Sequence, residues 1–85
     1  MENLILYKMT WEEFEANIRD VLEIEDGVVL NRDEILEDTE FWSSMHALLV
    51  MAMAESEYNV SITGEDLRKS STLGNIYELL KSKIG

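Results

Sequence analysis

Apolar residues first recur at helical spacing after Thr10. Thr10 and Glu13 have the spacing of a capping box, in which a hydroxyl and a carboxylate satisfy free backbone amides at the start of a helix. The apolar positions that follow are separated by steps of three and four, so they share one face of a helix: Trp11, Phe14, Ile18, Val21 and Leu22. The pattern predicts a first helix that begins after Thr10.

Residues 25–42 have no sustained apolar period and contain Gly27 followed by five acidic residues. They predict a long connecting loop with one turn near residues 33–36. A loop of this length is often functional.

The character of the sequence changes at Ser43, because residues 43–54 contain no Asp, Glu, Lys or Arg. The segment is rich in Ala, Leu and Met, which are strong helix formers, and serine is a common helix cap. It predicts a central helix that ends at residues 58–62.

Two shorter helical segments follow the central helix. Residues 64–69 predict a short turn of helix, and Ser71 is placed to cap a last helix. In that last helix apolar residues recur at helical spacing: Leu73, Ile76, Tyr77, Leu80 and Ile84. The chain as a whole predicts an all-α fold with a long loop between the first and second helices.

The length of 85 residues predicts one small domain, residues 1–85, with a compact core. Residues 1–8 contain the apolar run Leu4–Tyr7, which either extends the first helix backward or forms an N-terminal extension that packs separately; the pattern leaves both alternatives open. This run and residues 47–54 are too short for a signal-peptide core or a membrane span. We therefore expect a cytoplasmic protein, and we also expect a monomer.

Charge narrows the classes of partner. The chain has 18 acidic and 7 basic residues and a formal net charge of −11, which opposes binding to nucleic acid or anionic lipid and favours partners with basic patches. Residues 1–40 hold 13 acidic and 3 basic residues, whereas residues 41–85 hold 5 acidic and 4 basic residues. The absence of cysteine excludes disulfides, thiolate zinc sites and a cysteine nucleophile.

Metal and catalytic sites find no support in the sequence. An EF-hand loop with Gly27 at its sixth position would place Leu22 and Ile24 where oxygen ligands are required, so this calcium motif is rejected. Ser44 and His46 are two residues apart on one predicted helix and point away from each other, so His46 is badly placed to act as a base for Ser44. We expect no metal site, no catalytic residues and no enzyme activity.

The junction between the long loop and the uncharged helix, residues 41–45, is the remaining candidate site. A serine at a helix N-terminus lies where free backbone amides and the positive end of the helix dipole favour an attached phosphate. Serine is also the commonest kind of helix cap. Local sequence leaves both interpretations open.

The order of elements over residues 9–84 resembles the acyl carrier protein family. The resemblance implies a small four-helix bundle of that type. Members of this family bear a phosphopantetheine arm on the serine of an Asp-Ser-Leu motif, and the corresponding triplet here is Ser43-Ser44-Met45. Alignment of Tyr58 with the aromatic residue that ends the family's second helix places the arm on Ser44.

A second motif supports the resemblance. Some free-standing carriers have Trp-Ser-Ser-Leu at this place, followed by Thr-Gly-Glu/Asp-Asp-Leu/Ile-Arg, and this chain has Trp42 before its serines and Thr63-Gly64-Glu65-Asp66-Leu67-Arg68 downstream. The family's Asp is replaced by Ser43, which removes a carboxylate from the surface that arm-transferring enzymes meet. Ser43 still has the capacity to cap the helix.

The resemblance implies a function in lipid or polyketide biosynthesis. A phosphopantetheinyl transferase would attach 4'-phosphopantetheine from coenzyme A to Ser44, and acyl groups would be carried as thioesters between acyl-loading and ketosynthase-type enzymes. The alternative is a carrier-like module that binds proteins and never receives the arm.

The uncharged central helix departs from the acidic second helix that is common in the family. If Met45, Leu48 and Ala52 point inward, then Leu49, Val50 and Met53 are not completely hidden. We therefore predict an unusually hydrophobic partner contact, formed by Trp42, Ser43, Met45, His46, Leu49 and Met53. The alternative is that residues 4–7 fold across this helix and bury it.

Overall fold

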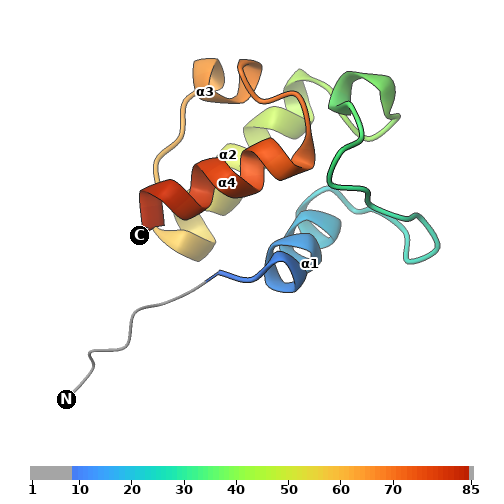
Figure 1. Ribbon diagram of the computed structural model, residues 1–85, viewed down its shortest axis with the longest axis horizontal. Coiled ribbons are helices and arrows are strands. Elements are labelled where there is room, and N and C mark those ends of the chain that lie inside the picture. The colour runs from blue at the N-terminus through green and yellow to red at the C-terminus, as the bar shows by residue number, and fades with distance from the viewer. Residues whose placement is uncertain (1–8, 85) are drawn as a thin grey trace.

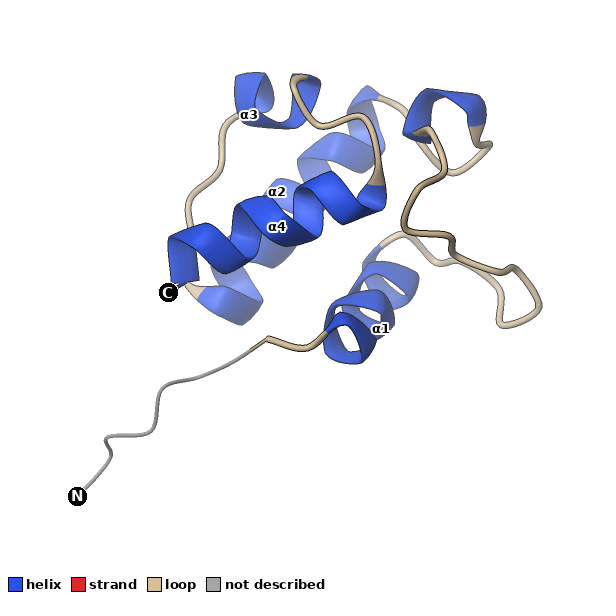
Figure 2. Ribbon diagram, in the orientation of Figure 1, coloured by secondary structure: helices blue, strands red, loops and turns tan. Residues whose placement is uncertain are grey.

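The computed structural model describes residues 9–84, which form four α-helices and one short 3₁₀ turn (Figure 1). The elements in chain order are α1 (Trp11–Val21), η1 (Leu36–Asp38), α2 (Ser44–Tyr58), α3 (Gly64–Arg68) and α4 (Leu73–Ile84). The prediction of an all-α fold with four helices is confirmed, and Figure 2 shows helices and loops throughout the part of the chain that the structure describes. The two alternatives for residues 1–8 fall outside the described residues.

Helix α1 begins where the capping pattern predicts. The Thr10 hydroxyl accepts a hydrogen bond from the backbone N–H of Glu13 at 3.1 Å. Along the predicted apolar face Phe14, Ile18 and Leu22 are buried, while the first and fourth residues of the set, Trp11 and Val21, are partly buried against the core. Apolar periodicity is therefore a sufficient signal for α1, because polar residues occupy its outer face.

The long loop after α1 is held against the start of α4. The backbone N–H of Gly74 donates to the Arg32 carbonyl at 3.0 Å, and the N–H of Leu36 donates to the Ser71 carbonyl at 2.8 Å. The Arg32 guanidinium lies over the rings of Trp11 and Tyr77, 4.8 and 5.0 Å from their centroids. These contacts place η1 beside the residues that lead into α4, and η1 lies slightly later in the chain than the predicted turn at residues 33–36.

Helix α2 is oriented differently from the prediction. Its core face consists of Val50, Met53, Ala54 and Tyr58, whereas the residues predicted to point inward are exposed: Met45, Leu48 and Ala52. Because apolar residues surround most of this helix, its sequence does not determine which face turns inward. The prediction that Met53 is available to a partner is wrong, since this side chain belongs to the core.

The ends of the later helices are fixed by local hydrogen bonds. Thr63 and Asp66 form a reciprocal capping box at α3, and the N–H of Thr63 that bonds the Asp66 carboxylate lowers the pKa of that group. At α4 the cap is Thr72 and not the predicted Ser71, because the Thr72 hydroxyl accepts from the N–H of Asn75 at 3.0 Å. The Asn75 side-chain oxygen in turn accepts from the backbone N–H groups of Ser71 and Thr72.

Candidate functional site

The two serines at the start of α2 have different environments. Ser43 is the N-cap residue, and its hydroxyl accepts from the backbone N–H of His46 at 3.3 Å. The same hydroxyl lies 2.8 Å from His46 Nδ1. Ser44 is the first residue of α2 and is exposed, and its hydroxyl has no hydrogen-bond partner within residues 9–84. The capping role is therefore filled by Ser43, and the Ser44 hydroxyl is available.

His46 belongs to the cap. It is partly buried, and the contact of its ring with Ser43 directs it to the cap residue and not to Ser44. The arrangement agrees with the sequence argument that residues 44 and 46 point apart on a helix. His46 therefore supports the start of α2 and does not activate the Ser44 hydroxyl.

The electrostatics at Ser44 favour a negatively charged group. Ser44 opens a helix of 15 residues, whose first backbone amides and dipole present positive charge at this end. The first turn of α2 contains no acidic residue that would oppose a phosphate. A phosphate ester on Ser44 is therefore compatible with the local charge, although this chain carries a large negative charge overall.

A hollow of about 700 Å³ lies directly beside Ser44. Its walls come from η1, the start of α2, helix α3 and the connection from α3 to α4. Trp42, Ala47, Leu48, Met51 and Leu67 provide apolar surface, and Arg68 and Glu37 provide charge. The hollow has both apolar and polar lining next to an available hydroxyl, which suits an elongated group that carries an apolar end.

An exposed apolar strip extends from this hollow along the outer face of α2. The exposed fractions are 63% for Met45, 62% for Leu48 and 37% for Leu49, and Ile35 from the loop is 45% exposed. An apolar patch of this kind on an otherwise charged chain is typical of a contact surface. Sequence reasoning missed Leu48, although its spacing of four residues from Ser44 places the two side chains on one helix face.

Only some of the candidate site residues predicted from the sequence lie together at the start of α2. Ser43, Ser44 and Met45 are exposed at the start of α2, and His46 and Trp42 lie beside them with partial burial. Leu49 is at the edge of the exposed strip. Arg68 of α3, which lines the hollow, was not singled out, because only the fold brings α3 next to α2.

Two features that would indicate other kinds of function are absent from residues 9–84. None of the helices there has the length and apolar character needed to cross a membrane. In the same residues, His, Asp and Glu side chains do not gather in a group of three or more that could hold a metal ion.

Both the sequence and the fold are similar to those of known proteins. No protein-family model matches the chain. The polyketide-8 synthase acyl carrier protein 2 of Streptomyces avermitilis is 31% identical over 74 residues, which are 87% of this chain and 84% of the relative. The fold is similar to the solution NMR structure of a holo acyl carrier protein from Geobacter metallireducens, with a TM-score of 0.69, 23% identity and 84% of each chain covered. The resemblance found in the sequence is thus confirmed: this chain belongs to the acyl carrier protein family, whose members are carriers and not catalysts.

Proposed function

We propose that this protein carries acyl groups as thioesters on a 4'-phosphopantetheine arm attached to Ser44. The observation that carries the proposal is the exposed Ser44 hydroxyl, which has no partner in the described structure and lies at the positive end of α2. A relative named as a polyketide synthase carrier favours polyketide assembly over other acyl chemistry. The arm supplies the thiol that this cysteine-free chain lacks.

The attachment requires only one group from this chain. The Ser44 oxygen forms a bond to the pantetheine-bearing phosphorus of coenzyme A, the bond between that phosphorus and the bridging oxygen breaks, and adenosine 3',5'-bisphosphate leaves. The proton of the hydroxyl goes to a base of the phosphopantetheinyl transferase, since His46 is engaged at Ser43. The amides at the start of α2 then face the new phosphodiester.

The other residues at the site position the arm and exclude water from it. Trp42, Leu48 and Met51 give the hollow an apolar wall against which an acyl group can be sheltered, and methionine adapts to cargo of different shape. Arg68 offers a cation at the rim for a polar part of the arm. Tethering raises the effective concentration of the cargo near each partner enzyme and does not lower a chemical barrier.

The modified serine is Ser44 and not Ser43. Addition of a group to Ser43 would remove a cap worth about 1 kcal/mol and its contact with His46. Ser44 gives up no hydrogen bond within residues 9–84 when it is modified.

The contact with acyl-loading and ketosynthase-type enzymes is proposed to be apolar. Met45, Leu48 and Leu49 form its exposed part, and Trp42, Ser43 and His46 border it at the helix start. Met53 is left out because it is buried.

The test is intact-mass spectrometry after coexpression with a promiscuous phosphopantetheinyl transferase. We expect one arm per chain, complete loss of the arm in Ser44→Ala, and retention in the matched variant Ser43→Ala, whose free energy of unfolding should fall by about 1 kcal/mol. Modification of Ser43 would overturn the site. Absence of any arm would overturn the function and favour an unmodified module that binds proteins.

A further inference from the structure

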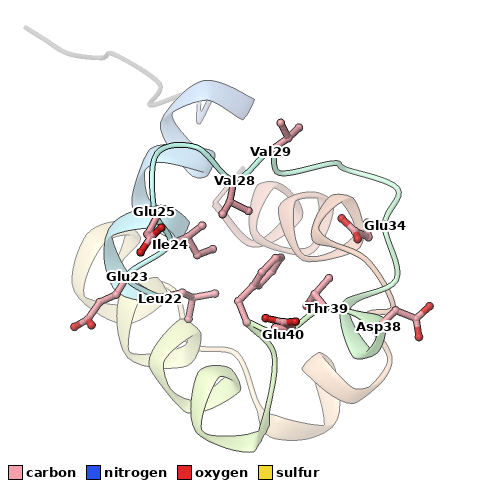
Figure 3. A pocket seen from close by; sticks show the side chains of 11 residues that line it. Leu22, Glu23, Ile24, Glu25, Val28, Val29, Glu34, Asp38, Thr39 and Glu40 are labelled. Atoms are coloured by element: carbon pink, nitrogen blue, oxygen red, sulfur yellow. The ribbon is translucent and has the colours of Figure 1, made fainter.

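A second hollow, of about 440 Å³, lies on the other side of η1. It is formed by the end of α1, the loop that follows it and the segment before α2 (Figure 3). The hollow shares no lining residue with the one beside Ser44. It therefore offers a separate surface, which the attachment of an arm does not use.

The floor of this second hollow is apolar and open to solvent. Val28 is 40% exposed and points into the hollow, where Leu22, Ile24 and Phe41 provide further buried or partly buried apolar surface. Val29 is 80% exposed and points outward from the rim (Figure 3). Single exposed apolar residues are common on protein surfaces, but Val28 continues into a hollow lined by three further apolar side chains and so forms part of a contiguous patch. Such a patch favours contact with an apolar side chain.

The rim of the hollow is acidic. Five carboxylates line it, and Figure 3 shows that they come from both sides of the apolar floor: Glu23, Glu25, Glu34, Asp38 and Glu40. No Lys or Arg is among the lining residues, and the adjacent Arg19 is occupied by an ion pair with Glu15 at 3.2 Å and by the carbonyl of Glu25 at 3.1 Å. The negative charge of the rim is therefore not neutralised by a lining cation.

We propose that this hollow, the acidic hollow, binds a partner protein through one apolar side chain flanked by Arg or Lys. Positive charge alone would leave the apolar floor unfilled, so the partner needs an apolar side chain there. Basic residues on either side of that side chain would complement the five carboxylates of the rim. The net charge of −11 opposes a second copy of this chain as the occupant, and the same sign excludes nucleic acid. The proposal does not depend on an arm at Ser44.

The probe for the test is a short peptide with one Phe between two pairs of Arg, added to the full-length, ¹⁵N-labelled protein. We expect saturable amide shifts at residues 22–29 and 38–41, and binding that weakens as salt is raised, because the rim is exposed. A peptide of equal charge with Gly in place of Phe should bind about tenfold more weakly, since it leaves the apolar floor unfilled.

Matched variants distinguish binding of the peptide in the acidic hollow from its nonspecific electrostatic attraction to the rest of the acidic surface. Val28→Ser should weaken binding of the Phe peptide several-fold, while Leu49→Ser, a similarly exposed residue of α2, should leave it unchanged. The double variant Glu34→Gln, Glu40→Gln should weaken binding more than Glu55→Gln, Glu65→Gln, which removes the same charge elsewhere.

Three results would each overturn the proposal: equal affinity for the Phe and Gly peptides, shifts spread evenly over the acidic surface, or equal effects of the two double variants. Each variant changes exposed side chains, and an unchanged circular dichroism spectrum establishes that it folds. Repetition in the Ser44→Ala background should give the same affinities, so failure here is distinct from failure of the carrier function.

Discussion

At the scale of single residues, Gly74 shows how tightly the long loop is fixed. Its N–H donates to the Arg32 carbonyl at 3.0 Å, and a β-carbon at Gly74 would lie 3.1 Å from the same oxygen. That oxygen belongs to backbone held by the stacking of Arg32 on Trp11 and Tyr77, so it has little freedom to retreat. The absence of a side chain at Gly74 therefore permits the loop to dock on α4.

We predict that Gly74→Ala lowers the free energy of unfolding by about 1 kcal/mol, because crowding of the Arg32 carbonyl outweighs the helix propensity of alanine. Urea unfolding measures this change. The matched control is Gly64→Ala, where nothing lies within 4 Å of the added carbon and a gain of about 0.5 kcal/mol is expected. Equal gains at both positions would show that the loop yields freely.

Residue patterns predict a cap well where one candidate stands alone, as at Thr10, which has the hydrogen bond that its position implies. The prediction of Ser71 failed because Ser71 and Thr72 are adjacent and equally capable. The choice is made by a tertiary contact, the β-bridge between Ile35 and Thr72, which sequence spacing does not reveal.

At the scale of elements, α2 shows where periodicity stops being informative. The first and last helices have polar residues on their outer faces, so their inward faces are predictable. In α2 the uncharged stretch allows several rotations of the helix about its own axis. Packing against the apolar faces of α1 and α4 selects the rotation that buries Val50 and Met53. The exposed strip at Met45 and Leu48 follows from that selection.

This rotation makes a prediction about glutamate substitutions in α2. Leu48→Glu and Leu49→Glu should retain the helical circular dichroism signal and slow arm attachment or acyl transfer about tenfold, because they place charge in the exposed strip. Met53→Glu should instead lower the free energy of unfolding by about 3 kcal/mol or more, since it buries a carboxyl group in the core.

Transfer rates and thermal melts distinguish these outcomes. Folded Leu48→Glu and Leu49→Glu variants with unchanged transfer rates would remove the strip as a partner contact. A Met53→Glu variant as stable as the parent would contradict the assigned rotation of α2.

At the scale of the whole molecule, Tyr58 links α1 to α2 across the core. Asn17 Nδ2 donates to the Tyr58 hydroxyl, which joins residues 41 positions apart. Burial raises the pKa of Tyr58 above its ordinary value of 10.0; the Asn17 bond opposes this rise, and the carboxylates of Glu13 and Glu57 add to it. The folded state therefore holds the proton more firmly than the unfolded chain does.

The sign of this pKa shift predicts loss of stability in alkali. Because the pKa is raised on folding, the stabilisation is complete below pH 10 and is lost as pH rises through the folded value. Urea unfolding at a series of pH values should show a parent more stable than Tyr58→Phe by about 1 kcal/mol at neutral pH. This difference should shrink above pH 10. A difference that stays constant with pH would contradict the assignment.

The overall fold and the candidate site at Ser44 are predictable because helical periods, caps and the Ser43-Ser44-Met45 triplet are local signals. The acidic hollow is not predictable, because most of its lining comes from the loop after residue 24, where the pattern predicts no regular structure. Its shape depends on the docking of Arg32 and Leu36 against α4, contacts that join distant parts of the chain. Sequence reasoning placed the acidity correctly but gave no reason for a concave surface there.

The two tryptophans have different surroundings, so the fluorescence of each one reports on a different part of the protein. Trp42 lines the hollow beside Ser44, whereas Trp11 stacks with Arg32 and meets the Tyr77 ring edge-on at 5.5 Å. Neither lines the acidic hollow. In a Trp11→Phe chain, the emission of Trp42 would therefore follow the arrival and cargo of an arm without an added dye.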